Sequence, residues 1–341
     1  MKKCLKILLV IVIVTIIGLF CLYRYFECNP IHMGGGGPSD SPPARCYAKE
    51  QEQQRKTQMA QLEQLAALEF TCKKEERPPL SEETQQLYNY ALYHDLHNMW
   101  TGDKGDEVWN GLARYYRIAA ANGDYKANVR LQYLLNTGRI STDMPQTEVH
   151  NLNEELAKQL PATAYYNLYG YLDEDYGVRT EEGGKYAYLR KAADLGSREA
   201  QYTVAEMLAD IEDKEETQEA FKYRLNLVKQ LRACASEQGL GDASSNLGSS
   251  LKLNKKYAEA VKSYHQGVKN GDSISASVLR DGFSGKTSKD SLDFLDLAPD
   301  EERSRRYNII WNYLTDNDYL HPKVPDLDEI CLLYTSPSPR D

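Results

Sequence analysis

The sequence predicts an all-α protein in which helical hairpins are stacked along the chain. Three observations predict this fold class. A short motif at helix ends recurs every 30 to 45 residues or so. Apolar residues follow each copy of the motif at helical spacing. Hydrophobic residues make up 41% of the 341 residues, a share typical of a globular protein. We expect a transmembrane helix to precede this array.

The N-terminal segment, residues 1–24, is predicted to be that membrane anchor. Lys2, Lys3 and Lys6 precede an uncharged apolar run over residues 7–23, which as a helix spans about 25 Å. A cleaved signal peptide is the alternative, but no small-residue cleavage site follows the run. The positive-inside bias then places the rest of the chain outside the cytoplasm. We therefore expect a single-pass inner-membrane protein with a periplasmic body.

Composition divides the chain into six segments. Strong helix formers follow a Gly/Pro-rich loop, Pro78 and Pro79 end that run, and Ser81 can cap the next helix. The last residues, CLLYTSPSPRD, back-translate into a sequencing adapter, so the true C-terminus after Ile330 is expected to be missing. The expected order is an anchor (1–24), a Gly/Pro-rich loop (25–46), a stalk helix (47–79), a repeat solenoid (80–283), a capping segment (284–330) and an adapter read-through (331–341).

Four cysteines lie in the predicted exported part, which allows three disulfide pairings. The stretch between Cys46 and Cys72 is predicted to be one helix about 36 Å long, too long for bridged Cα atoms about 4.4–6.8 Å apart. A Gly/Pro-rich loop separates Cys28 from Cys46, so we predict a disulfide between these two. Cys72 then either pairs with Cys234 or leaves Cys234 as a buried free thiol.

The repeat is defined by a marker position at residues 123, 160, 196, 239 and 271, which is Gly in four units and Leu160 in the second. A small residue stands four positions after each marker, and apolar residues follow four and eight positions later. This spacing follows one face of a helix, where a small residue lets the neighbouring helix approach closely. Pro161 is expected to force Leu160 out of the α region. The rows are Ala127, Leu131, Leu135; Ala164, Leu168, Leu172; Ala200, Val204, Leu208; Ala243, Leu247, Leu251; and Ser275, Leu279, Phe283.

These units resemble the Sel-one-like repeat, a relative of the tetratricopeptide repeat. The match runs from about Tyr115 to Phe283 and is clearest in YLRKAADLGSREAQYTVAEML. The resemblance implies a right-handed α-solenoid with a concave binding surface. The sequence departs from the family in two respects. The second repeat matches the pattern poorly, and the repeats do not contain the paired cysteines of the cysteine-rich branch.

Two further segments resemble a narrower group of membrane-anchored enterobacterial Sel-one-like proteins. They are GGGGPSDSPP and EERSRRYNIIWNYLTDNDYLHPKVPDLDEI. Members of that group are often encoded beside type VI secretion phospholipase effectors, and some are their immunity proteins. The resemblance implies a periplasmic protein-binding scaffold that neutralises a lipase effector. The alternative is an envelope scaffold that assembles cell-wall or secretion machinery.

Charge and side-chain chemistry point to protein binding instead of catalysis. The formal net charge of −9 disfavours nucleic acid and favours a basic protein partner, a solvated acidic surface being the alternative. His94 and His97 share a helix face, but no third ligand stands at a recognisable spacing. The sequence therefore predicts no metal, no cofactor, no catalytic residues and no enzymatic activity.

Tyrosine is the remaining candidate for function, with 25 residues against 6 Phe. Tyrosine is enriched at protein interfaces, because its ring packs while its hydroxyl stays hydrated. The predicted protein-binding residues lie on the first helices of repeats: Tyr133, Tyr165, Tyr169 and Tyr202.

Overall fold

The computed structural model of the chain describes residues 69–98, 105–181, 183–211, 216–286, 288–289, 291 and 294–331. The chain divides into two units, Met1–Glu63 and Gln64–Asp341, and every described residue belongs to the second. The predicted anchor, the Gly/Pro-rich loop and the stalk helix before residue 69 lie outside the described residues. Within the described ranges, no helix has the length and apolar character needed to cross a bilayer.

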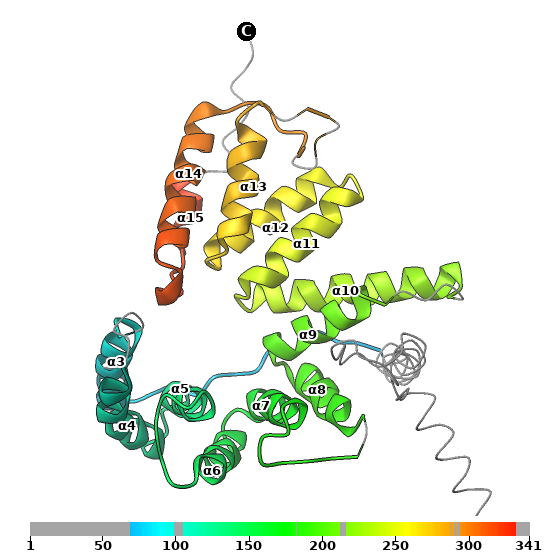
Figure 1. Ribbon diagram of the computed structural model, residues 1–341. Helices are drawn as coiled ribbons and strands as arrows, with labels where there is room; N and C mark the ends of the chain where they lie inside the picture. The colour runs from blue at the N-terminus through cyan, green and yellow to red at the C-terminus, as the bar shows by residue number, and fades with distance from the viewer. Residues whose placement is uncertain are drawn as a thin grey trace, which may run out of the picture. The chain divides into compact units, whose positions relative to one another are not determined.

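The second unit is built from α-helices, and its described residues contain no strand, which confirms the predicted all-α class (Figure 1). From α3 to α14, each helix packs on the next one along the chain. The helices are α3 (Glu82–Leu96), α4 (Gly105–Ala121), α5 (Tyr125–Asn136), α6 (Pro145–Ala157), α7 (Pro161–Asp173), α8 (Gly184–Leu195), α9 (Arg198–Ala209), α10 (Gln218–Glu237), α11 (Gly241–Leu253), α12 (Tyr257–Lys269), α13 (Ser273–Phe283), α14 (Glu301–Asp316), the 3-10 helix η2 (Asp318–Leu320) and α15 (Leu327–Ile330).

The helices form consecutive pairs. The most extensive contacts are within the pairs α5–α6, α7–α8, α9–α10, α11–α12 and α13–α14. At the N-terminal side, α3 and α4 form a further pair. The predicted marker turns connect one pair to the next. Stacked pairs of this kind bury a continuous core in which each unit contacts its neighbours.

The marker positions end helices as the sequence predicts. The four marker glycines, Gly123, Gly196, Gly239 and Gly271, all have positive φ and stand between one helix and the next, where glycine adopts the left-handed conformation at little cost. The second repeat, whose marker is Leu160, has a different turn. Leu160 has φ −130° and Pro161 begins α7, in agreement with the expected effect of proline on the preceding residue.

Four of the five predicted rows lie in the core. Their members on α5, α9, α11 and α13 are all buried. On α7, Ala164 is buried, but Leu168 and Leu172 are only half-buried. Tyr171 is buried in their place, and its hydroxyl donates to Gln132 Oε1 at 2.7 Å. In the second repeat, therefore, the buried side chain near the end of the helix is Tyr171, one position before the row residue Leu172, and it makes a polar contact.

Residues 69–80 are extended, whereas residues 69–79 were assigned to the predicted stalk helix. Helix α3 then starts where the sequence places it, and the Ser81 hydroxyl accepts from the Thr84 amide at 3.2 Å. Pro78 and Pro79 remove two backbone donors from this stretch. The extended form is further explained by contacts to distant helices, described below.

At the C-terminal side, α14 packs on α13, where the sequence predicts a capping helix. The Asp300 carboxylate caps α14 by accepting from the Arg303 amide at 2.9 Å. Residues 321–331, the tail segment, contain the short helix α15. Leu327 and Cys331 of this segment are buried in the C-terminal hydrophobic cluster.

Candidate protein-binding surface

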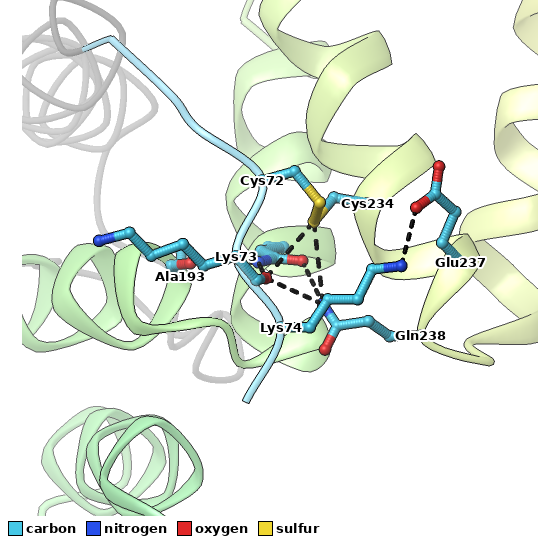
Figure 2. The surroundings of a disulfide bond; sticks show 8 residues. Cys72, Lys73, Lys74, Ala193, Cys234, Glu237 and Gln238 are labelled. Atoms are coloured by element: carbon cyan, nitrogen blue, oxygen red, sulfur yellow. Dashed lines mark hydrogen bonds and ion pairs between the residues drawn. A yellow bond between two sulfur atoms is a disulfide. The ribbon is translucent and has the colours of Figure 1, made fainter. Parts of the chain in front are cut away.

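A disulfide joins Cys72 to Cys234 of α10 (Figure 2). It fastens the strap, residues 69–80, to a helix 162 residues further along the chain. Cys72 is exposed and Cys234 is buried. The sequence left two states open for Cys234, and the structure shows the paired one. The predicted bond between Cys28 and Cys46 lies outside the described residues and stays a prediction.

Polar contacts hold the strap on the array next to the disulfide. Gln201 Nε2 donates to the Lys73 carbonyl at 2.9 Å, and Gln238 Nε2 donates to the same carbonyl at 3.4 Å. Lys74 Nζ lies 2.9 Å from Glu237 Oε2 (Figure 2). Two amides and one ion pair therefore fix the backbone of the strap beside helices α9 and α10.

Glu75 of the strap supplies the N-terminal cap that α7 lacks. Helix α7 begins at Pro161, and Leu160 before it offers no side-chain acceptor. Glu75 Oε1 accepts from the amides of Ala162 at 2.6 Å and Thr163 at 3.2 Å. A carboxylate at this end satisfies free amide groups and interacts favourably with the helix dipole. The strap is therefore part of the second repeat as well as a covering segment.

The strap comes closest to the array at the Gly196 turn. The Glu75 amide donates to the Gly196 carbonyl at 3.3 Å. A Cβ atom at Gly196 would lie 2.6 Å from Glu75 N and 2.8 Å from the Lys74 carbonyl carbon, and φ is +109°. Gly196 is therefore needed for two reasons: its positive φ forms the turn, and its lack of a side chain leaves room for the backbone of the strap.

The tail segment lies against another marker turn. A Cβ atom at Gly271 would collide with the Pro322 carbonyl oxygen. The Val324 amide donates to the Lys269 carbonyl at 3.2 Å. The strap and the tail segment therefore each lie against a turn that carries a repeat marker.

His265 of α12 is buried and fixes the tail segment through hydrogen bonds to the buried Tyr307 and to Asp328, which is largely exposed. Its Nε2 lies 2.7 Å from Asp328 Oδ1 and its Nδ1 lies 2.9 Å from the Tyr307 hydroxyl. Lys269 Nζ donates to Asp328 Oδ2 at 2.6 Å. Burial lowers the pKa of His265, whereas the hydrogen bonds from Lys269 and His265 lower the pKa of the Asp328 carboxyl. Because Asp328 lies 63 residues from His265 in the chain, helical spacing does not predict this network.

Two of the predicted binding residues, Tyr165 and Tyr169, are half-buried in a tyrosine cluster on α7 and α8. Tyr165 stacks on Tyr188 with 6.2 Å between ring centroids. Lys191 Nζ lies 4.1 Å from the Tyr165 ring centre and donates to its hydroxyl at 2.8 Å. Tyr169 lies 6.4 Å from Tyr186, and burial raises the pKa of its hydroxyl. The pair shares one surface, as its spacing on a helix predicts.

The other two predicted residues lie in separate networks. Tyr133 is 42% exposed, and its ring centre lies 4.8 Å from the Arg130 guanidinium and 5.2 Å from that of Arg139. Tyr202 is half-buried, accepts from Asn246 Nδ2 at 2.8 Å, and has a pKa raised to about 12 by burial and by nearby carboxylates. The structure therefore places the four tyrosines on three sets of contacts instead of one continuous patch.

His94 and His97 are both exposed on α3. His97 Nδ1 lies 2.7 Å from the Tyr93 carbonyl oxygen. Among the described residues, no three His, Cys, Asp or Glu side chains are grouped so that they could hold a metal ion. The two imidazoles instead contact neighbouring tyrosine rings.

Asp95 is a buried carboxylate that the sequence analysis missed. It accepts from the Tyr116 hydroxyl at 2.6 Å, from Arg130 Nε at 2.7 Å and from Trp109 Nε1 at 3.0 Å. These donors come from α4 and α5, so one side chain of α3 joins three helices. Burial and the bond to Asp95 raise the pKa of Tyr116. Because the partners are 14 to 35 residues away, helical spacing gives no signal for them.

One protein family matches part of the chain. It is described as "Domain of unknown function (DUF6396)", and the match covers residues 275–339. The match includes α13, α14 and the tail segment, and it runs into the segment that the sequence analysis assigned to an adapter. A comparison with curated proteins finds no match.

Solved structures from Pseudomonas aeruginosa are similar over most of the chain. PA5086 is 23% identical with a TM-score of 0.56, and the alignment covers 79% of this chain and 96% of that one. Immunity protein Pa5087 is 22% identical, with a TM-score of 0.57 and the same coverage. Immunity protein PA5088 is 21% identical, with a TM-score of 0.58 and coverage of 79% and 95%. This chain therefore shares the fold of these proteins across nearly their whole length.

Proposed function

We propose that this chain is a Sel-one-like immunity protein that binds a type VI secreted lipase effector and occludes its active site. The observation that carries the proposal is the likeness to two immunity proteins over 95–96% of their chains. Because nearly the whole of each neighbour is covered, the likeness is not limited to one pair of helices. The resemblance of the sequence to anchored Sel-one-like proteins encoded beside phospholipase effectors points to the same role.

Two surface features support binding over catalysis. Tyr133 of α5 and Tyr165 of α7 each have a cation over the ring that restricts its movement, and fixed aromatic side chains are typical of interface anchors. The Asp95, His265 and Tyr307 side chains are buried and bonded to structural partners, which suits a role in holding helices together. We therefore assign function to shape and surface chemistry, without a reacting group.

We also propose that the array lies in the periplasm, held to the inner membrane by residues 1–24. The support is the disulfide between Cys72 and Cys234, since such bonds persist in oxidising compartments such as the periplasm. The apolar run after three lysines is the second support. A secreted effector that acts on the envelope would meet its inhibitor in this compartment.

Co-expression with the effector encoded next to the gene tests the proposal. Cells that export the effector to the periplasm should lyse or stop growing, and the full-length chain should restore growth. A variant without residues 1–24 would lose export and should fail to protect. Absence of protection by the full-length chain, together with absence of a complex on size exclusion, would contradict the immunity role.

A further inference from the structure

Four aromatic side chains follow one face of α3, and we name them the aromatic stripe. Tyr90, Tyr93, His94 and His97 stand at positions i, i+3, i+4 and i+7, the spacing of neighbours on a helix surface. Ring centroids are 4.7 Å apart for Tyr90 and His94, 5.3 Å for Tyr93 and His94, and 4.3 Å for Tyr93 and His97. The rings therefore form one continuous surface.

The aromatic stripe faces solvent. Tyr90 is 50% exposed and Tyr93 is 60% exposed. Two rings from other elements extend it, with Tyr115 of α4 at 5.2 Å from Tyr90 and Tyr319 of η2 at 6.2 Å from His97. Aromatic side chains that already contact each other lose little freedom on binding, which is one reason why tyrosine is frequent at interface hot spots.

Unpaired carboxylates lie at both ends of the stripe. Glu83 stands seven residues before Tyr90 and continues the same helix face, and Asp316 and Asp318 lie close to Tyr319 in the chain. All three acidic residues are exposed, and within the part of the chain that the structure describes none of them forms an ion pair. Helix α3 itself contains no Lys or Arg. The surface therefore combines electron-rich ring faces with three exposed carboxylates, a combination that attracts cations.

A cation of this chain already lies over a tyrosine ring next to the stripe. The Arg114 guanidinium lies 4.7 Å from the ring centre of Tyr115, and its Nη2 donates to the Tyr115 hydroxyl at 2.8 Å. Among the described residues, no Lys or Arg lies over the rings of Tyr90 or Tyr93. Because the Tyr90 and Tyr93 side chains are 50% and 60% exposed, their rings are accessible to a cation from another molecule.

We propose that the aromatic stripe of α3 is a docking surface for a segment of the effector that presents arginine or lysine side chains. This inference rests on the proposed function, because it names the surface and the chemistry of the same partner. The cationic groups would lie over Tyr90 and Tyr93, and the flanking carboxylates would pair with further basic residues. The net charge of −9 on the whole chain favours the approach of such a segment.

A defined peptide tests the stripe without the effector. The probe is a capped peptide of alternating glycine and arginine, titrated into the full-length chain and compared with its glutamate counterpart. Replacing both Tyr90 and Tyr93 with Leu should weaken arginine-peptide binding about tenfold or more, whereas replacing both with Phe should change it less than about threefold, because the ring faces remain. The matched control is Tyr223→Leu on α10, where the tyrosine is also 50% exposed. The affinity of this variant for the arginine peptide should equal that of the wild-type chain.

The outcomes separate specific docking from general attraction to an acidic surface. An equal loss in Tyr223→Leu, or no loss when Tyr90 and Tyr93 are both Leu, would overturn the proposal. Circular dichroism confirms that each variant is folded, and the Phe variant keeps the test valid if the Leu variant unfolds. If the Leu variant unfolds, the Phe variant must still bind the arginine peptide. In addition, the affinity of a Tyr90→Glu variant for this peptide must differ from that of Tyr223→Glu, because Tyr90→Glu removes one ring of the stripe and leaves the neighbouring rings in place.

A second arm uses the neighbouring effector itself. If the wild-type chain binds and inhibits the effector while the Leu variant binds it about tenfold more weakly, both proposals are supported. If the wild-type and Leu variants bind the effector equally, the docking surface is wrong although the immunity role stands. If the wild-type chain binds the arginine peptide through the stripe but does not bind the effector, the immunity role fails and the cation-binding surface remains.

Discussion

The strap and the tail segment are held on the helical array by different means. The strap, residues 69–80, is fixed by a disulfide, and its Glu75 side chain completes helix α7. The tail segment, residues 321–331, is fixed by a histidine, a lysine and a carboxylate. The first attachment depends on redox state and the second on pH. One repeat architecture therefore carries a covalent attachment and a titratable one on similar turns.

Loss of the disulfide should have the largest effect on this comparison. The Cys72→Ser variant should lower the free energy of unfolding by about 2–4 kcal/mol, because the bond closes a long loop in the unfolded chain. Denaturant unfolding of the full-length chain measures the effect. Reduction should destabilise the wild-type protein by a similar amount, and it should destabilise the Cys72→Ser variant much less, because that variant has already lost the bond to Cys234. Equal stability of Cys72→Ser and the oxidised wild type would show that the strap is held without the bond.

The Gly196→Ala substitution should destabilise the strap side by about 2–3 kcal/mol, because the new Cβ atom meets the strap backbone at a positive φ. Gly111 of α4 provides the control, since a Cβ there meets nothing within 4 Å. Gly111→Ala should stabilise the helix by about 0.5–1 kcal/mol. Thermal unfolding distinguishes the two. Similar shifts for both variants would mean that the strap does not press against the Gly196 turn.

The Glu75→Ala substitution should cost about 1–2 kcal/mol through loss of the α7 cap. Glu76 is the matched control, because it is the next residue and is exposed; its replacement by Ala should change stability by less than about 0.5 kcal/mol. Hydrogen exchange of the Ala162 and Thr163 amides provides a local readout. Unchanged protection of these amides in Glu75→Ala would contradict the capping role.

On the tail side, the expected effects are smaller and depend on pH. His265 has a lowered pKa in the folded chain, so the unfolded chain binds a proton more readily and stability should fall as the pH drops below about 6.5. Asp328, whose pKa is also lowered, should add a further loss as the pH falls below about 4. Hydrogen exchange of the Val324 amide between pH 7 and about pH 3 measures this release.

The Asp328→Asn substitution sharpens the same test. Because the Asp328 side chain is largely exposed, its loss should cost only about 0.5–1 kcal/mol at pH 7, and the acid-dependent release near pH 4 should become shallower. Glu329→Gln, a change at an exposed neighbour, should leave the pH profile as it is. A profile for Asp328→Asn that overlays the wild-type one would show that this carboxylate does not hold the tail segment.

Local spacing predicted the array well. The marker glycines and four of the five apolar rows follow from periods of three and four residues, because each row lies within one helix. The α7 row deviates because Tyr171 enters the core to bond Gln132 of the preceding pair, and a single helix pattern does not reveal that partner.

The attachments of the strap and the tail segment could not be predicted in the same way. Cys72 and Cys234 are 162 residues apart in the chain and meet only in the folded structure. Their pairing therefore stayed open when the sequence was considered alone. Glu75 acts on a helix 87 residues away, and His265 meets a carboxylate 63 residues away. On the candidate surface, the tyrosine excess indicated interface chemistry. The aromatic stripe was missed because His94 and His97 were considered as metal ligands instead of ring surfaces.

The most direct test of the proposed immunity role is to measure the lipase activity of the proposed effector in the presence of the purified, oxidised chain. We expect a stable complex on size exclusion and loss of phospholipase activity when the chain is present in equal amount. Full activity of the effector with the chain in excess would contradict this role.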